Sequence, residues 1–256
     1  MSRYDLEDLR RIMTLLRSPE GCPWDREQTH ASIRRDMLEE AYEVAEAIDN
    51  NDAAALKEEL GDVLFQVVFH ARMAEEAGLF TFDDVVDGVA QKMVFRHPHV
   101  FGSAHADNSQ EALSTWDAQK QVEKDQRTAA DTLDAVARSL PALIRAEKIQ
   151  KKANKAGFDW DSIDPVLDKI EEEVTELRQA AHQGTNTEEE LGDLLFAAAK
   201  AGFFLGLDSE QALHNACEKF IRRFRRVEEL ADGPMNQMDL PALEELWRQA
   251  KAETNP

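Results

Sequence analysis

The chain has 256 residues, 43% of them hydrophobic, which is enough for one large or two small domains with a filled core. Its formal net charge of −21 opposes binding to nucleic acid or to an anionic membrane surface, so neither is an expected partner. Two cysteines are too few for a disulfide framework, and the scarcity of glycine, proline and tyrosine favours helices. We therefore expect a nearly all-α protein.

Hydrophobic periodicity defines the expected elements. Apolar residues recur at three- and four-residue spacing, first clearly at Leu38, Ala41, Ala45 and Ile48, and this pattern predicts about ten helices and no strand. Glycine, proline and asparagine cluster at the breaks between them, which lie at residues 18–24, 50–52, 78–82, 98–109, 157–165, 183–186 and 232–238. No apolar run approaches the roughly 18 residues of a membrane span and no charged leader is evident, so the cytoplasm is the expected location.

One acidic octamer occurs twice, as EELGDVLF at residues 58–65 and as EELGDLLF at residues 189–196. Other landmarks recur in the same order around both copies. They are Trp24-Asp25 and Trp160-Asp161, the EExxE runs at 39–43 and 172–176, Lys92/Arg96 and Lys219/Arg223, and Trp116/Lys120 and Trp247/Lys251. This ordered self-similarity predicts a tandem duplication, with domains at residues 1–125 and 126–256 and a polar hinge near residues 124–132.

Acidic side chains at helical spacing lie in and before each octamer. In the first copy Glu40 and Glu43 share one helix face, and Glu59 and Asp62 share a face of the next helix. The short connection at residues 50–52 makes the two helices antiparallel neighbours, so their acidic faces converge. Four hard oxygen donors suit Mg²⁺ or Mn²⁺. The second copy offers the corresponding set, Glu173, Glu176, Glu190 and Asp193.

Two plainer interpretations of these acids stay open. Most acidic clusters in a chain with 51 acidic residues are solvated helix faces, and Glu190 also fits a capping box with Thr187. Gly61 and Gly192 favour the metal site instead. Glycine inside a helix is less favourable than alanine by about 1 kcal/mol, so its presence in both copies indicates a role other than helix formation. A close approach of a neighbouring helix or a ligand explains their presence.

With its EExxE run followed by ExxD, the sequence resembles the MazG family of all-α nucleoside triphosphate pyrophosphohydrolases. The resemblance covers almost the whole chain and is carried by GCPWDREQTH (21–30), LEEAYEVAEAI (38–48), FRHPHVFG (95–102), GFDW (157–160), EKFIRRF (218–224) and LWRQAK (246–251). It implies tandem helical bundles with four-helix metal-binding cores, usually in a homodimer. It also implies hydrolysis of a nucleoside triphosphate to monophosphate and diphosphate, in nucleotide-pool housekeeping or stress regulation, with a regulatory protein as a further partner.

The two copies differ in their cations, and this difference assigns their roles. Lys169 lies one turn before Glu173, whereas Asp36 holds the matching position before Glu40, and Arg222 matches Phe95. The second copy is therefore expected to be catalytic and the first weakly active or inactive. By motif position, Glu172 orients or deprotonates the attacking water, and the nucleotide is bound by Lys169, Lys219, Arg222, Arg223 and Trp247. Trp247 also fits a simple packing role.

Two other protein classes also use helical bundles, and a basic stripe fits several roles. Ferritin-like di-iron proteins need Glu-x-x-His on two helices, and only Glu27-x-x-His30 has that spacing. A non-catalytic helical regulator that binds metal or nucleotide is the other alternative. A basic stripe at Arg145, Lys148, Lys152 and Lys155 fits nucleotide guidance, an acidic partner helix or a solvated face.

Overall fold

The computed structural model describes residues 3–124 and 126–254, and within them every regular element is a helix. The chain divides into two compact units, Met1–Lys120 and Gln121–Pro256. The division falls in the last turn of α7 (Ser109–Glu123), shortly before the expected boundary residue 125, which lies outside the described residues. The expected all-α class is confirmed.

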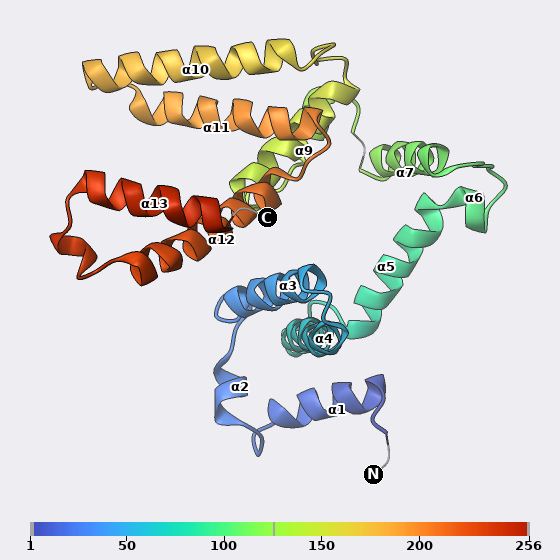
Figure 1. Ribbon diagram of the computed structural model, residues 1–256. Coiled ribbons are helices and arrows are strands. Elements are labelled where there is room, and N and C mark those ends of the chain that lie inside the picture. The colour runs from blue at the N-terminus through green and yellow to red at the C-terminus, as the bar shows by residue number, and fades with distance from the viewer. Residues whose placement is uncertain (1–2, 125, 255–256) are drawn as a thin grey trace. The chain divides into compact units, whose positions relative to one another are not determined.

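The first unit is built around a helical hairpin (Figure 1). Its helices α3 and α4 pack extensively on each other, as the short connection between them predicts. Asn51 takes a left-handed conformation (φ 53°) in the turn, and the side chain of Asp52 accepts hydrogen bonds from the N–H groups of Ala54 and Ala55, which caps α4. The helices before α7 are α1 (Leu6–Leu16), α2 (Pro23–Glu27), α3 (Arg34–Asp49), α4 (Ala53–Glu76), α5 (Phe82–Arg96) and α6 (Pro98–Phe101).

The core of the first unit lies between α1, α4 and the start of α5. Capping boxes fix the starts of α1 and α5, through Asp5 with Asp8 and Thr81 with Asp84. Met13, Ile33 and Phe69 are almost completely buried. The buried cluster consists of Met13, Ile33, Val68, Phe69, Ala71, Met73 and Phe82. This core anchors the C-terminal half of α4 and leaves its acidic N-terminal half on the hairpin.

The second unit repeats the hairpin with α10 and α11 (Figure 1). Gly184 (φ 69°) and Asn186 (φ 55°) make the left-handed turn between these helices. The α9 helix packs on α11, where Gln150 donates a hydrogen bond of 2.8 Å to the carbonyl of Phe196. The helices are α8 (Ala129–Asp134), α9 (Ala142–Lys155), α10 (Asp164–Gln183), α11 (Thr187–Phe204), α12 (Ser209–Leu230), a 3₁₀ turn at Met235–Gln237 and α13 (Leu240–Thr254).

Three short helices exceed the number predicted from periodicity. They are α2, α6 and α8, of five, four and six residues. The first two begin with a proline within segments expected to be breaks, and α8 falls in the expected hinge. A helix of one turn or so is too short to show a period of 3.6 residues. In the described residues, no helix combines the length and apolar character needed to cross a membrane.

Candidate metal centre

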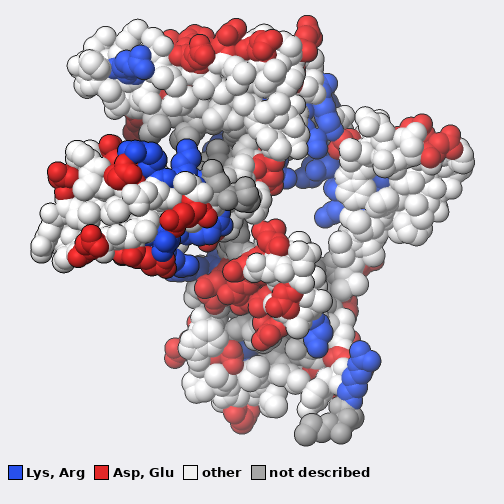
Figure 2. All heavy atoms as spheres, in the orientation of Figure 1, with Lys and Arg blue, Asp and Glu red and all other residues white. Residues whose placement is uncertain are grey.

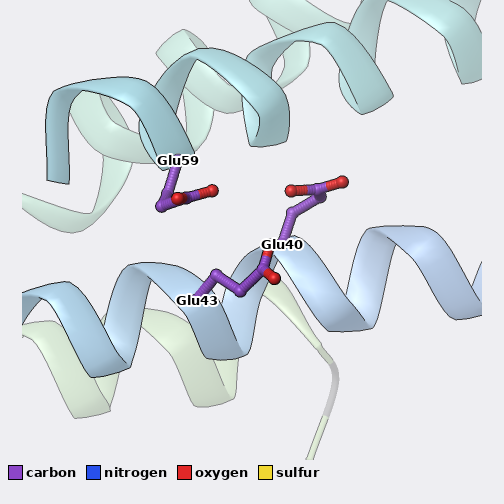
Figure 3. Close-up of side chains that lie close together, drawn as sticks. All are labelled: Glu40, Glu43 and Glu59. Carbon is purple, nitrogen blue, oxygen red and sulfur yellow. The ribbon is translucent and has the colours of Figure 1, made fainter. Parts of the chain in front are cut away.

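The first unit brings three predicted acids together between α3 and α4. Carboxylate oxygens of Glu40, Glu43 and Glu59 lie within 4.8 Å of one another. Figure 3 shows Glu40 and Glu43 rising from α3 and Glu59 descending from α4 into the space between the two helices. Asp62, the fourth predicted ligand, is exposed and lies outside this cluster. Three of the four predicted carboxylates therefore converge, and the fourth does not.

The second unit has the corresponding cluster between α10 and α11. Carboxylate oxygens of Glu173, Glu190 and Asp193 lie within 4.8 Å of one another. Glu173 is only 4% exposed, and its Oε2 atom has no hydrogen-bond partner among the described residues. Glu176 is exposed and outside the cluster. A buried carboxylate oxygen without a partner is costly in a folded protein unless a ligand completes it.

Mutual repulsion marks both clusters electrostatically. Burial, followed by the charges of Asp62, Glu43 and Glu59, raises the pKa of Glu40. Burial, followed by the charges of Glu176, Glu173, Glu189 and Asp193, raises the pKa of Glu190. Asp62 and Glu176 thus act on their clusters through charge although they do not join them. Like charges this close favour the binding of a cation.

Among the described residues, no neighbouring helix packs against the glycines of the two octamers. A Cβ atom built on Gly61 or on Gly192 meets no described atom within 4 Å. The expectation of a close approach by a neighbouring helix of the same chain is therefore wrong, and an approach by a ligand or a second chain remains. The glycines stand on exposed turns of α4 and α11.

The capping-box interpretation of Glu190 is also wrong. The N-cap of α11 is Asn186, not Thr187, and no side chain caps the helix start. The carboxylate of Glu190 is therefore not occupied by backbone N–H groups and is available to the cluster.

Lys169 contacts the second cluster directly. Its Nζ atom lies 2.7 Å from Oε1 of Glu173 and 3.0 Å from Oε1 of Glu172. The sequence placed Lys169 on the face of Glu173 but assigned it to phosphate, so this ion pair was missed. The spacing of four residues from Lys169 to Glu173 is the signal that predicts it. Glu172 is exposed beside the cluster, where water has access.

The other predicted nucleotide-binding cations lie on α12, a different helix from the two that carry the acidic cluster. The α12 helix packs mainly on α13 and α9. Lys219 and Arg222 are exposed, and Arg223 is half-buried. Trp247 of α13 packs on Phe220, with ring centroids 5.0 Å apart, so it is at least a packing residue. The described ion pairs connect Lys169, and not Lys219 or Arg222, to the acidic cluster.

The matching aromatic position of the first unit has different neighbours. Trp116 corresponds to Trp247, and the guanidinium of Arg96 lies 5.0 Å from the centre of its ring. His97 contacts the same ring with a centroid distance of 4.7 Å. Both tryptophans are half-buried, so the two units differ in what packs on the ring, Arg96 and His97 in the first and Phe220 in the second.

His30, the histidine that the di-iron alternative requires, contacts another histidine instead. Nδ1 of His30 lies 2.8 Å from Nδ1 of His70, and the two rings stack. Burial, then the neighbouring His30, lowers the pKa of His70. The two acidic clusters found in the described part of the chain consist of carboxylates alone. This donor set fits a hard divalent cation better than a His-ligated iron pair.

Negative charge gathers around both hairpins in the space-filling view. Figure 2 shows acidic side chains concentrated over α3 in the first unit and along α10 in the second. Basic side chains of the second unit gather elsewhere, around α9 and α12. The basic stripe predicted from Arg145 to Lys155 lies on α9, where Arg145 is half-buried and Lys148 is exposed.

Comparison with known proteins identifies residues 28–101 and 162–228 as MazG nucleotide pyrophosphohydrolase domain. The chain is similar to the nucleoside triphosphate pyrophosphohydrolase of Escherichia coli strain K12, with 47% identity across 97% of both chains. It is similar to the nucleoside triphosphate pyrophosphohydrolase/pyrophosphatase MazG of Thermotoga maritima, with 43% identity over 96% of this chain and 95% of that one. The uncharacterized protein YabN of Bacillus subtilis is 42% identical over 97% of this chain, which spans 52% of YabN. Each matched segment contains one of the two acidic clusters.

Proposed function

The chain belongs to the MazG family of nucleotide pyrophosphohydrolases, and on that premise we propose that its second unit, with the cluster of Glu173, Glu190 and Asp193, is the catalytic centre. The reaction is the hydrolysis of a nucleoside triphosphate to a monophosphate and diphosphate. The single observation that carries this assignment is Glu173, because its buried carboxylate belongs to the cluster and its Oε2 atom has no hydrogen-bond partner among the described residues. A bound cation or its water would complete such an oxygen.

The donor set of the cluster fits Mg²⁺ or Mn²⁺. Three carboxylates within 4.8 Å supply hard oxygen ligands from two helices, and two of the three residues remain open to solvent. Mg²⁺ typically keeps several waters that substrate phosphates replace. Glu176 lies close enough to act on Glu190 by charge and is proposed as the fourth ligand. A bound divalent cation supplies charge neutralisation for the triphosphate and activation of water.

The chain's own residues supply the remaining steps. Glu172, exposed next to Glu173, is placed to orient the attacking water or to accept its proton. Lys169 and the α12 cations Lys219, Arg222 and Arg223 balance the phosphate charge, for which arginine offers paired donors. Trp247 walls the base beside Phe220. The cytoplasm, where nucleoside triphosphates are abundant, is the proposed location.

The first unit is proposed to be inactive or nearly so. Its cluster of Glu40, Glu43 and Glu59 has the oxygen donors to bind a cation. Asp36 replaces the cation Lys169, however, and Phe95 replaces the cation Arg222. Metal binding without the matching phosphate recognition does not support turnover.

A homodimer is proposed because the octamer faces are unpartnered within each unit. Leu60 and Leu64 on α4 are exposed next to Gly61, and Leu191 and Leu195 on α11 are exposed next to Gly192. Apolar residues beside a glycine offer a second helix a close approach. A second copy of the chain, docked there by its own hairpin, completes a four-helix core.

Product analysis tests the proposed reaction. The purified protein, given a panel of nucleoside triphosphates and Mg²⁺, is expected to yield monophosphate and diphosphate by ³¹P NMR. Chelation by EDTA should abolish the reaction, and excess Mg²⁺ or Mn²⁺ should restore it. Formation of a nucleoside diphosphate and phosphate contradicts the proposal. Nucleotide binding without any product supports the alternative of a non-catalytic regulator.

A further inference from the structure

Lys169 forms an ion pair with the buried carboxylate of the second-unit cluster. Its ammonium group bonds one oxygen of Glu173 at 2.7 Å and one of Glu172 at 3.0 Å. The side chain of Glu173 is only 5% exposed, whereas that of Lys169 is 37% exposed. The ammonium therefore reaches in from the surface to a buried carboxylate. Oε1 of Glu173 is satisfied by Lys169, while Oε2 has no described partner.

A buried carboxylate needs a counter-charge, and here a lysine supplies it. An ionised carboxylate that is taken out of water without a cation is strongly unfavourable. The ammonium of Lys169 donates hydrogen bonds to both Glu173 and Glu172 and so supplies that counter-charge from the surface.

The first unit has an acidic cluster at the corresponding place without this lysine. Asp36 holds the position that matches Lys169, one turn before Glu40. In the described residues no cation is paired with Glu40, Glu43 or Glu59. The two clusters share the matching acids Glu40/Glu173 and Glu59/Glu190, and only the second has a resident cation among the described residues.

We propose that Lys169 is the counter-ion of the metal-free second-unit site, and that a divalent cation displaces its ammonium from Glu173 and so releases it to bind substrate phosphate. This inference rests on the proposed function of the cluster as a metal centre. It makes phosphate recognition conditional on the metal, because Glu173 and Glu172 hold two of the three donors of this ammonium until the metal binds. Nucleotide without metal then meets a lysine that is already engaged.

Metal titration without nucleotide tests the displacement. Mn²⁺ binding is measured by calorimetry in a Glu40→Gln/Glu59→Gln background, so that only the second-unit site reports. Lys169→Met removes the competing ammonium and is expected to tighten Mn²⁺ binding on the order of tenfold. Lys151→Met, which removes an exposed lysine of α9 that has no ion pair to the cluster, is the matched control and should leave the affinity unchanged. An unchanged or weaker Mn²⁺ affinity for Lys169→Met overturns the inference.

Two further measurements avoid dependence on that one variant. In the wild type, acylation of Lys169 by an amine-reactive reagent, followed by mass spectrometry, should become faster when Mn²⁺ is added. Equal rates with and without Mn²⁺ contradict displacement. In the first unit, with Glu173→Gln as background, Asp36→Lys should weaken Mn²⁺ binding on the order of tenfold. An unchanged affinity there also counts against the inference.

These readouts separate the inference from the proposed function. All three measure metal or lysine and need no turnover. If the protein releases no diphosphate but the Lys169→Met variant binds Mn²⁺ more tightly, the lysine displacement is supported and the proposed reaction is contradicted. If the protein is active but its Mn²⁺ affinity does not change in Lys169→Met, the proposed reaction is supported and the lysine displacement is contradicted.

Discussion

Glu190 lies in a concentration of negative charge contributed by both helices of the second hairpin. Burial and four neighbouring acids raise its pKa from the ordinary value of 4.5. A carboxyl group whose pKa is raised on folding stabilises the folded state when it is protonated. That contribution is complete below pH 4.5 and is lost as the pH rises through the raised value. At neutral pH without metal, Glu190 therefore works against folding.

Glu190→Gln is expected to raise the melting temperature of the metal-free protein at pH 7. The gain should shrink as the pH is lowered toward 4.5, because wild-type Glu190 then becomes neutral as well. Saturating Mg²⁺ should reverse the order, since only the wild type binds the cation fully and gains stability by mass action. Differential scanning fluorimetry at several pH values measures all three effects. A metal-free variant that melts below the wild type at pH 7 contradicts this picture.

At the residue scale, the sequence predicted the site by position better than by contact. Three carboxylates of each predicted quartet converge, but the fourth, Asp62 or Glu176, stays outside the cluster. Helical spacing defines a face and not the rotamer that brings an oxygen inward. The Lys169–Glu173 pair was legible at four-residue spacing, whereas the burial of Glu173 depends on packing between α10 and α11.

At the element scale, a buried ion pair ties α11 to the segment before α10. Nζ of Lys200 lies 2.5 Å from Oδ1 of Asp159, and both side chains are largely buried. Burial alone would raise the pKa of Asp159, but hydrogen bonds from Lys200 and Asn154 lower it overall. This contribution to stability is present above the unfolded pKa and is lost as the pH falls through the folded value.

Lys200→Met should lower the unfolding free energy by about 3–5 kcal/mol, because it leaves the carboxylate of Asp159 buried without its cation. Urea unfolding followed by circular dichroism measures this loss. Arg248→Met, which breaks the exposed pair of Arg248 with Glu245, is the matched control and should stay within about 0.5 kcal/mol of the wild type. Equal stability of the two variants would show that the buried pair does not hold α11.

Gly192→Ala separates helix stability from association. An added Cβ meets no described atom, so alanine should stabilise α11 by about 1 kcal/mol. Because a second copy is proposed to approach at this glycine, the same change should weaken the dimer, as measured by analytical ultracentrifugation over a concentration series. Gly88→Ala, in the open middle of α5, should stabilise without changing association. Unaltered dimerisation of Gly192→Ala would argue against this docking face.

The long helices were predictable because each carries a three- and four-residue apolar period, and some also begin at a capping side chain. Asp52 at the start of α4 shows such a cap. The short helices α2, α6 and α8 were missed because one turn shows no period. The start of α11 was missed because Asn186, in a left-handed conformation, precedes Thr187. Local geometry of this kind depends on the turn as a whole and not on a motif of four residues.

On the scale of the whole molecule, the duplication gives each unit the same hairpin and the same type of cluster. The units differ in what surrounds it. The second has Lys169 and a Trp247 packed on Phe220, whereas the first has Asp36 and a Trp116 packed on Arg96. A tandem protein can keep a binding-competent but inactive copy when the second copy carries the reaction. Catalysis by the second unit is therefore the central claim.

Diphosphate release by two matched variants tests that claim most directly. Glu173→Gln and Glu40→Gln remove the same carboxylate from the same place in the two hairpins. Loss of a single outer-shell partner in a metal site typically reduces activity 10–100-fold, so loss of the proposed ligand Glu173 should reduce the rate by at least about 100-fold. Glu40→Gln should retain a rate close to that of the wild type. The opposite result, with Glu40→Gln inactive and Glu173→Gln active, would contradict the assignment of catalysis to the second unit.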